Sequence, residues 1–346
     1  MPRRLTISLY ALAILLASAA FAQQVTGTWT AFVSKKDTDR LNFQFRKDGN
    51  RRSNMGTDIR LSELTGLAPD ALMVPSRDVK FTLTRDAGVV SFDGHFRDGA
   101  GVGNYSFAPN ADYVKEMGAL GYSGLDEKKL FEMAMIDVTR AYTRELQSLG
   151  FKPDLEGLIE ARIFNVNRAQ VEGLKSVGYD NLSLKKLVEL RVHGVTPEYI
   201  KEMRAAGFNE SLDKFAEMHM FGVTPEYRET MAKSGYPNLP AEKLIEFKIH
   251  GITPAFIQQM QSLGFTDLSA NKLTELKIFN VNADQVNELK QLGYSGLSAD
   301  KLVELRVHNI GREFIQRVMK AGYKHPSIDQ LVEMKLFGIR KNKDLI

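Results

Sequence analysis

The sequence predicts an α+β multidomain protein in which a small antiparallel β-sandwich or barrel precedes an α-solenoid of eight two-helix repeats. Two observations carry this prediction. Residues 24–109 alternate apolar and polar side chains between turn sequences, whereas from about residue 111 onward a glycine-aromatic pair returns every 28 or 29 residues. An apolar segment at the N-terminus further indicates that the chain is exported.

Residues 1–22 are expected to be a signal peptide. Arg4 precedes an apolar run that extends to Leu16, and Ala20 and Ala22 supply the small residues that a signal peptidase recognises. About 17 residues separate Arg4 from Ala22, which is short for a bilayer core of ~30 Å at ~1.5 Å per residue. We therefore expect cleavage before Gln23, no integral membrane segment after cleavage, and a periplasmic or extracellular location.

Composition excludes several classes of function. The chain has no cysteine, so it has no disulfide, no thiolate metal site and no thiol nucleophile. Once Arg3 and Arg4 are removed with the signal peptide, 44 basic residues remain against 42 acidic ones, a net charge of +2. This balance does not indicate the concentrated basic face that nucleic-acid binding normally needs. We expect no nucleic-acid partner.

Residues 23–110 are predicted to form the β-rich domain. Alternation with period two is typical of strands with one buried side, and turn sequences such as Asp98-Gly99-Ala100-Gly101 separate the alternating segments. About six strands result, enough for an antiparallel sandwich or small barrel. The apolar residues that define the clearest strands are Leu41, Phe43, Phe45, Val79, Phe81, Leu83, Val90, Phe92, Phe96, Tyr105 and Phe107.

Residues 111–342 are predicted to form the repeat array, with a short tail at 343–346. The glycine of the glycine-aromatic pair recurs at Gly121, Gly150, Gly178, Gly207, Gly235, Gly264, Gly293 and Gly322. The eight units begin near Tyr113, Tyr142, Gln170, Tyr199, Tyr227, Phe256, Gln285 and Phe314. Because no flexible linker separates the two domains, and Asn110 is placed to cap the first helix, we expect a rigid junction.

Each unit is predicted to contain two short helices. Thr196 is a good N-cap, and Pro197 takes the first helical position, where a missing N–H costs nothing. Gly207 tolerates the left-handed conformation that ends a helix, and Phe208 can fold back as an apolar clamp. The second helices are expected to begin after Ser183, Ser269, Ser298 and Ser327.

The second helix of a unit is predicted to be buried on more than one side. It carries Leu187, Val188, Leu190 and Val192, a pattern that suits a helix sandwiched between successive units. Helices of about ten residues are marginal alone in water. The units must therefore stack into a solenoid in which each repeat contacts chiefly its neighbours.

A period of two units is superimposed on the repeat. Near the end of the second helix, phenylalanine and histidine alternate, which indicates duplication of a block of ~57 residues. The histidines do not form a shared metal site, because layers ~8–10 Å apart place them on the order of 20 Å from one another, against ~2.1 Å for a zinc–nitrogen bond. The alternating residues are Phe164, His193, Phe221, His250, Phe279, His308 and Phe337.

One glutamate occupies the same place in every second helix. A catalytic residue has no reason to occur eight times, so we interpret these residues as a structural ladder that bonds the next unit's backbone or basic side chains. The ladder consists of Glu132, Glu160, Glu189, Glu217, Glu246, Glu275, Glu304 and Glu333. Partner binding is instead expected at positions of the first helix that vary between units, namely Lys201, Glu229, Gln258 and Asn287.

No catalytic, cofactor or metal site is predicted. Ser91, Asp93 and His95 have the residue types of a catalytic triad, but successive members of one strand face lie ~6.6 Å apart, beyond hydrogen-bond reach. We interpret them as a polar outer face. The glycine-rich segment 99–103 precedes a strand instead of a helix, so it is a hairpin turn and no dinucleotide loop.

The phrase Leu-Val-Glu-Leu-Arg-Val-His-Gly-Val-Thr-Pro-Glu-Tyr-Ile-Lys-Glu-Met-Arg-Ala-Ala-Gly-Phe at 187–208 resembles extracytoplasmic helical repeats of bacterial proteins. Some of those proteins carry a membrane metallopeptidase domain of the antibiotic-sensor (BlaR1) type. The resemblance covers roughly residues 113–340, and the zinc motif of the metallopeptidase is absent, so no catalytic residue is carried over. The resemblance implies an interaction or sensing segment outside the cytoplasm.

These observations predict an exported, non-enzymatic scaffold that binds a protein or peptide partner along the helical repeats. An alternative is a sensor or carrier whose β domain binds a small apolar or glycan ligand. The aromatic residues of its strands favour the alternative, although a packed core explains Trp29, Phe43, Phe81 and Phe92 more simply.

Overall fold

The structure, a computed structural model, describes residues 25–34, 37–47, 54–73 and 75–338. The signal peptide expected at 1–22 and the tail expected at 343–346 lie outside these residues. The chain divides into two compact units, Met1–Arg191 and Val192–Ile346, and each is described by itself. Among the helices of the described ranges, none combines the length and the apolar character needed to span a bilayer.

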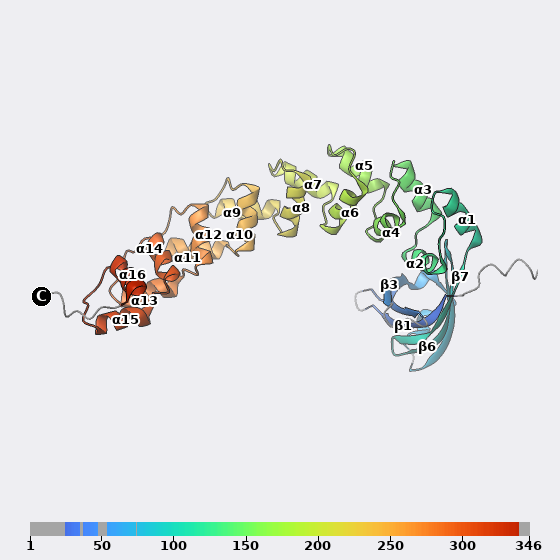
Figure 1. Ribbon diagram of the computed structural model, residues 1–346, viewed down its shortest axis with the longest axis horizontal. Coiled ribbons are helices and arrows are strands. Elements are labelled where there is room, and N and C mark those ends of the chain that lie inside the picture. The colour runs from blue at the N-terminus through green and yellow to red at the C-terminus, as the bar shows by residue number, and fades with distance from the viewer. Residues whose placement is uncertain (1–24, 35–36, 48–53, 74, 339–346) are drawn as a thin grey trace, which may run out of the picture. The chain divides into compact units, whose positions relative to one another are not determined.

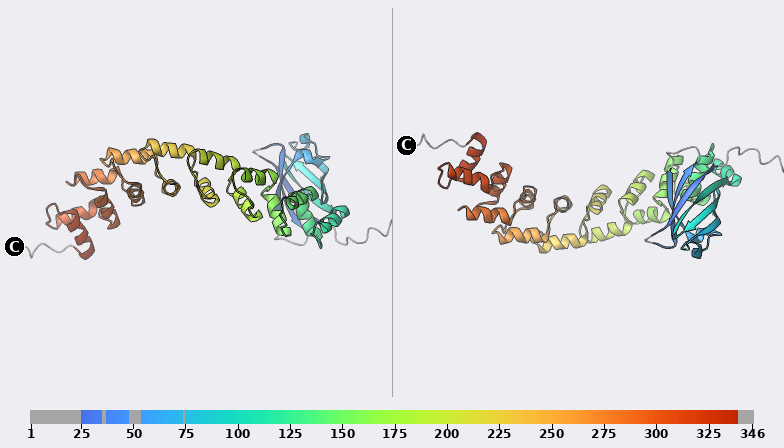
Figure 2. Two further views of the ribbon diagram at one scale, coloured as in Figure 1. Left: turned by 90° about the horizontal axis from the view of Figure 1, so that it is seen from above. Right: turned by 90° about the horizontal axis from the view of Figure 1, so that it is seen from below.

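The first unit contains one antiparallel sheet, which the described residues build from seven strands and which curls into a half-barrel (Figures 1 and 2). Its order is β3-β2-β1-β7-β6-β5-β4, so that β1 lies between β2 and β7. The strands are β1 (Val25–Val33), β2 (Arg40–Lys47), β3 (Asn54–Arg60), β4 (Leu64–Thr65), β5 (Arg77–Arg85), β6 (Gly88–Arg97) and β7 (Ala100–Pro109), with 3₁₀ turns at Leu61–Glu63 and Pro69–Ala71. The predicted antiparallel β domain is confirmed, as a single curled sheet and not as two packed sheets.

An aromatic cluster fills the inner side of the sheet. The Trp29 ring lies 5.6 Å from Phe81 and 5.7 Å from Phe43, between ring centroids, and Trp29 Nε1 donates to the Asn104 carbonyl at 3.1 Å. Gly103 makes room for the indole, because a Cβ there would lie 2.8 Å from Trp29 Nε1 and 2.2 Å from a strand carbonyl oxygen. Trp29, Phe43 and Phe81 are at most 2% exposed, so these aromatic side chains form a packed core.

Sixteen α-helices follow in the described part of the chain, and they form the eight predicted pairs. We call the odd-numbered member of each pair the first helix and the even-numbered member the second helix. They are α1 (Ala111–Ala119), α2 (Glu127–Ile136), α3 (Arg140–Ser148), α4 (Leu155–Ile163), α5 (Arg168–Ser176), α6 (Leu184–Val192), α7 (Pro197–Ala205), α8 (Leu212–Met220), α9 (Pro225–Lys233), α10 (Ala241–Ile249), α11 (Pro254–Ser262), α12 (Ala270–Ile278), α13 (Ala283–Gln291), α14 (Ala299–Val307), α15 (Arg312–Lys320) and α16 (Ile328–Phe337).

The predicted caps define the ends of the short helices. The Thr196 side chain accepts from the Tyr199 amide, and Pro197 opens α7. At the other end Gly207 has φ +87° and the Phe208 amide donates to the Met203 carbonyl at 3.0 Å, which is the predicted glycine cap. The second helices also end on left-handed residues, for example Gly222 with φ +66°. Near this tight exit, the second helices from α4 to α16 each carry an exposed apolar side chain.

The burial predicted for the second helix is wrong at one position. Leu187, Val188 and Leu190 are at most 6% exposed, as the apolar pattern predicts, but Val192 is 54% exposed. Neighbouring second helices pack on one another, as α8, α10, α12, α14 and α16 do in the second unit. Packing between neighbouring second helices therefore covers one broad side of such a helix and leaves the position equivalent to Val192 exposed.

The junction between sheet and repeats lies within the first unit. The second helix α2 packs on β1, β6 and β7, and its Phe131 ring stacks on Tyr105 at 5.1 Å between centroids. Phe131 also meets Phe45 at 5.6 Å and Phe107 at 5.5 Å. The sheet thus packs on one side of α2, where a neighbouring second helix packs in the later repeats.

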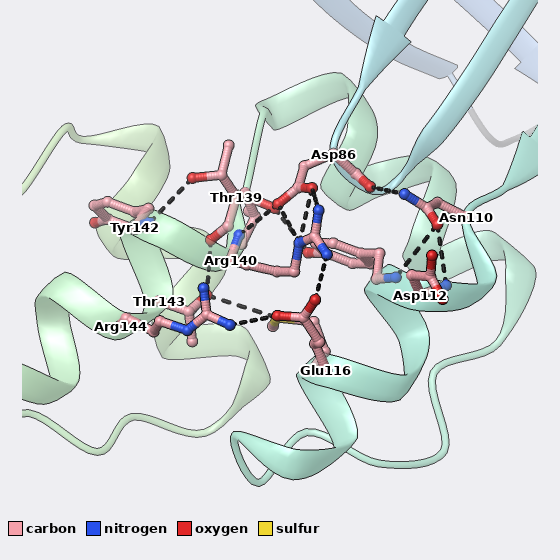
Figure 3. A network of polar contacts seen from close by, with 12 residues as sticks. Asp86, Asn110, Asp112, Glu116, Thr139, Arg140, Tyr142, Thr143 and Arg144 are labelled. Carbon is pink, nitrogen blue, oxygen red and sulfur yellow. Dashed lines mark hydrogen bonds and ion pairs between the residues drawn. The ribbon is translucent and has the colours of Figure 1, made fainter.

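A network of polar contacts secures the same junction (Figure 3). Asp86, in the turn between β5 and β6, accepts from the backbone N–H of Arg140 at 2.8 Å and from its guanidinium Nε at 2.9 Å. The Arg140 guanidinium also reaches Glu116 of α1, at 2.6 Å. Asn110 caps α1 and donates to the Asp86 carbonyl at 3.1 Å. A turn of the β domain is therefore bonded to the beginnings of α1 and α3.

Candidate functional site

Six of the eight ladder glutamates form an ion pair within their own helix. In six units a lysine lies three residues before the glutamate and forms an ion pair with it, as Lys214 does with Glu217 at 2.6 Å. The lysine, not the glutamate, makes the ionic link to the next unit, since Lys214 also reaches Glu242 of the following second helix at 3.4 Å. The six pairs are Lys129–Glu132, Lys186–Glu189, Lys214–Glu217, Lys243–Glu246, Lys272–Glu275 and Lys301–Glu304.

Replacing one ladder lysine should have a small, salt-dependent effect. We expect Lys214→Ala to lower the free energy of unfolding by ~0.5–1 kcal/mol at low salt, because two partly exposed ion pairs are lost. In 1 M salt, where the Debye length is ~3 Å, the difference should nearly vanish. Urea unfolding followed by circular dichroism measures it, with the exposed Lys290→Ala as control. A loss that persists in 1 M salt would show that the lysine stem, not its charge, stabilises the stack.

An exposed aliphatic side chain follows three residues after each ladder glutamate in the second unit. These side chains occupy equivalent positions at the ends of stacked second helices, so they lie next to one another in order, and we call them the aliphatic stripe. The stripe consists of Met220 (58% exposed), Ile249 (54%), Ile278 (54%), Val307 (53%) and Leu336 (57%). Large apolar side chains that are half exposed in a regular row are typical of an interaction surface.

Phenylalanine and histidine alternate beside the stripe, on the residue that follows each aliphatic one. Phe221 and Phe279 are 36% and 37% exposed, whereas His250 and His308 are half-buried. Each of these four residues is the C-cap of its helix. The alternation seen in the sequence thus becomes an alternation of ring chemistry along the edge of the stripe.

Basic side chains line the stripe on the position just before each aliphatic residue. Lys248 Nζ lies 3.9 Å from the centroid of Tyr227, and Lys277 Nζ lies 4.7 Å from that of Phe256. Where a glutamine replaces the aromatic ring, Arg306 Nε donates to Gln285 Oε1 at 3.0 Å. The third residue of the first helix therefore holds each of these three cations in place. We call His219, Lys248, Lys277, Arg306 and Lys335 the basic row.

In the first compact unit, the stripe position is buried in one repeat and exposed in the next. Met135 of α2 has the position of the stripe residues, three after Glu132, and it is only 3% exposed. It lies one turn after Phe131, which packs against the aromatic rings of the sheet. Ile163 of α4, at the same position, is 56% exposed. The stripe position is therefore buried in the first repeat, whose second helix packs on the sheet, and exposed in the second repeat.

The four residues predicted to bind a partner are all exposed, at equivalent positions of α7, α9, α11 and α13. Glu229 forms an exposed ion pair with Lys233 at 2.6 Å. Lys201, Gln258 and Asn287 lie with it on the first helices, whereas the stripe lies at the ends of the second helices. Sequence reasoning missed the stripe, although an aliphatic residue recurs at that position in every unit.

The described residues contain no group of three or more histidine, aspartate or glutamate side chains placed to hold a metal ion. His250 and His308 end separate helices, α10 and α14, with α12 between them.

On the outer side of the sheet, His95 has two side-chain partners on the neighbouring strand segment. Its Nδ1 lies 2.9 Å from Asp78 Oδ1, and its Nε2 lies 3.0 Å from Ser76 Oγ. Neither partner is Ser91 or Asp93, which share its own strand; Asp93 instead pairs with Lys80 at 2.8 Å. The three groups come together because β5 and β6 pair with Asp78 opposite His95.

No protein-family model matches the chain, and no match is found among curated proteins.

Proposed function

We propose that the protein is an exported scaffold whose helical repeats bind a protein or peptide partner along the aliphatic stripe. The observation that carries the proposal is the row of five half-exposed aliphatic side chains, one per layer. Apolar surface removed from water contributes roughly 25 cal/mol per Å². A partner that covers the whole row gains this contribution at each layer, as solenoid surfaces do for extended ligands.

The spacing expected for the stripe favours one shape of partner. Packed helices lie ~8–10 Å apart, and a polyproline-II segment presents every third residue to one side at intervals of about 9.3 Å. A β-strand fits less well, since its side chains alternate and every third one points away. The partner is therefore an extended polyproline-II segment with an apolar residue at every third position.

The basic row favours a partner with acidic side chains. Lys248 and Lys277 are held against aromatic rings one residue before the stripe, so that their positive charge stays beside the bound segment. Carboxylates between the apolar residues of the partner would meet these cations. Electrostatic complementarity of this kind contributes more to specificity and association rate than to affinity.

A designed peptide tests the proposal. A labelled 15-residue peptide of five Leu-Pro-Glu repeats should bind the mature chain in an anisotropy titration, and a peptide of the same composition without leucine at every third position should bind at least ~10-fold more weakly. The double variant Ile249→Asp/Ile278→Asp should lose binding by at least ~10-fold. Its stability should stay nearly unchanged, because both positions are more than half exposed.

The matched control is Gln258→Asp/Asn287→Asp, which adds the same charge at two predicted positions of the first helices. It should change affinity by less than ~2-fold. An equal loss in both double variants would mean that only charge repulsion was measured. A loss confined to the control would place the partner on the first helices, and equal binding of the two peptides would exclude the polyproline-II register.

The alternative, a β domain that binds a small ligand, has weaker support. Trp29, Phe43, Phe81 and Phe92 pack on one another and are at most 2% exposed, so an apolar ligand finds no aromatic platform among them. A role outside the cytoplasm, expected from the N-terminal segment and from the resemblance to extracytoplasmic repeats, is part of the main proposal.

A further inference from the structure

His95, Ser76 and Asp78 form a hydrogen-bonded chain on the outer face of the sheet, independent of the helical repeats. Asp78 lies in β5 directly opposite His95 of β6. Ser76 is two residues before Asp78, so both side chains project to the side on which His95 lies. The distances are 3.0 Å from Ser76 Oγ to His95 Nε2 and 2.9 Å from His95 Nδ1 to Asp78 Oδ1.

The direction of these hydrogen bonds follows from their chemistry. An ionised carboxylate only accepts, so His95 Nδ1 must carry the proton that is donated to Asp78. In a neutral imidazole the other nitrogen then has a free lone pair. When the His95 imidazole is neutral, Nε2 therefore accepts and the Ser76 hydroxyl donates to it. A serine whose proton is directed to a basic nitrogen, which is in turn oriented by a carboxylate, has the arrangement of an activated nucleophile.

Two exposed apolar side chains lie beside these hydrogen-bonded residues, on the side of β6 that faces β7. Val102 of β7 lies directly opposite His95 and is 55% exposed. Phe32 of β1 is 52% exposed and lies two residues beyond Thr30, the partner of Val102 in the sheet register. The sheet face around them is otherwise polar, with Thr30, Ser91 and Asp93. Phe32 and Val102 thus form an apolar surface within reach of a group bound at His95.

We propose that Ser76 is the nucleophile of an ester-hydrolysing site on the β domain, with His95 as its base and the Phe32–Val102 surface as the contact for an apolar acyl group. Ser76 Oγ attacks the ester carbonyl carbon while its proton passes to His95 Nε2. The carbon–oxygen bond to the alcohol breaks, and the alcohol oxygen takes that proton. Water then attacks the acyl-serine, its proton passes through Nε2 back to Ser76 Oγ, and the carboxylic acid leaves.

The role and the exposure of each side chain determine how much it is expected to contribute to catalysis. Ser76 and His95 make and break bonds, so they are the catalytic residues. Asp78 is a positioning residue, and its side chain is 97% exposed, so that water competes for the hydrogen bond to Nδ1. A buried aspartate in this role contributes up to ~10⁴-fold to kcat. For Asp78 we expect a loss of about 10-fold or less on change to asparagine.

Labelling and ester hydrolysis test the site in the full mature chain. A fluorophosphonate probe should modify Ser76, identified by peptide mass mapping, and p-nitrophenyl butyrate should be hydrolysed faster than p-nitrophenyl acetate. Ser76→Ala and His95→Ala should each abolish labelling at residue 76 and lower kcat/KM at least ~10-fold. Ser91→Ala, which changes an exposed serine of the same sheet face, is the matched control and should retain both.

The remaining variants separate the roles. Phe32→Ala should raise KM for the butyrate with little change in kcat, and Asp78→Asn should lower kcat with little change in KM. Labelling of Ser76 that persists in His95→Ala would overturn the proposal, because the serine would then react without its base. Absence of labelling at Ser76 in the unaltered chain, or hydrolysis that survives Ser76→Ala, would also overturn it.

Discussion

Phe131→Ala should lower the free energy of unfolding of the first unit by about 3–5 kcal/mol, the largest effect that we expect from one substitution. The Phe131 ring is 7% exposed and lies between Tyr105, Phe45 and Phe107, with centroid distances of 5.1, 5.6 and 5.5 Å. Truncation leaves a cavity between three rings that the sheet holds in place. It also removes the principal aromatic contact between α2 and the sheet, so we expect the repeats of this unit to lose their anchor.

The single tryptophan of the chain provides the measurement. Trp29 lies in the core of the sheet, so its fluorescence reports unfolding of that sheet during urea denaturation. Phe32→Ala makes the same chemical change at a ring that is 52% exposed, and it should cost less than ~1 kcal/mol. If Phe131→Ala costs no more than this control, the sheet and α2 do not stabilise one another.

Asp86→Ala should have the second largest effect, a loss of about 2–3 kcal/mol, because the hydrogen bond from the first N–H of α3 and the charged hydrogen bonds from the Arg140 guanidinium disappear together. The Asp86 carboxylate accepts from the Arg140 backbone N–H at the start of α3 and from its guanidinium. Asp86→Asn retains an oxygen for the backbone N–H and should cost less. A cost that is equal for the two variants would assign the whole effect to the charge.

The effect of Asp86 should depend on pH in a stated direction. Burial raises the pKa of its carboxyl, but the hydrogen bonds from Arg140 outweigh burial and hold the pKa below the ordinary value. A carboxyl whose pKa is lower in the folded state contributes stability above its unfolded pKa of ~3.9 and loses it as the pH falls through the folded value. The difference between the unaltered chain and Asp86→Ala should therefore be full at pH 7 and shrink below about pH 4. A difference that grows on acidification would contradict this assignment.

Features set by neighbouring residues were predicted from the sequence. Thr196 with Pro197, and Gly207 with Phe208, specify a helix start and a helix end within a few residues, so the structure shows the predicted caps. The two-residue strand β4 was not predicted, because Leu64–Thr65 is too short to show alternation. It exists because its partner β5 offers a free edge, which is a tertiary effect.

Features set by register between distant segments could not be predicted. His95 has the right residue types two and four positions away on its own strand, yet its partners are Ser76 and Asp78, 19 and 17 residues earlier. Only the pairing of β5 with β6 brings them together. The aliphatic stripe was visible as Val192 and its equivalents, but periodicity alone does not tell which apolar face of a helix its neighbours leave uncovered.

The packing of α2 on the sheet has a consequence for how the protein varied in evolution. The first two-helix repeat packs an apolar face against the sheet. In the later repeats, the side chains at the position of Met135 are exposed. A further block of two units inserted after the first would add two layers to the stripe and leave every contact of Phe131 and Asp86 as it is. The length of the stripe and the attachment of the repeats to the sheet can therefore change independently. Related chains are expected to differ in length by multiples of one block while the contacts at the junction stay the same.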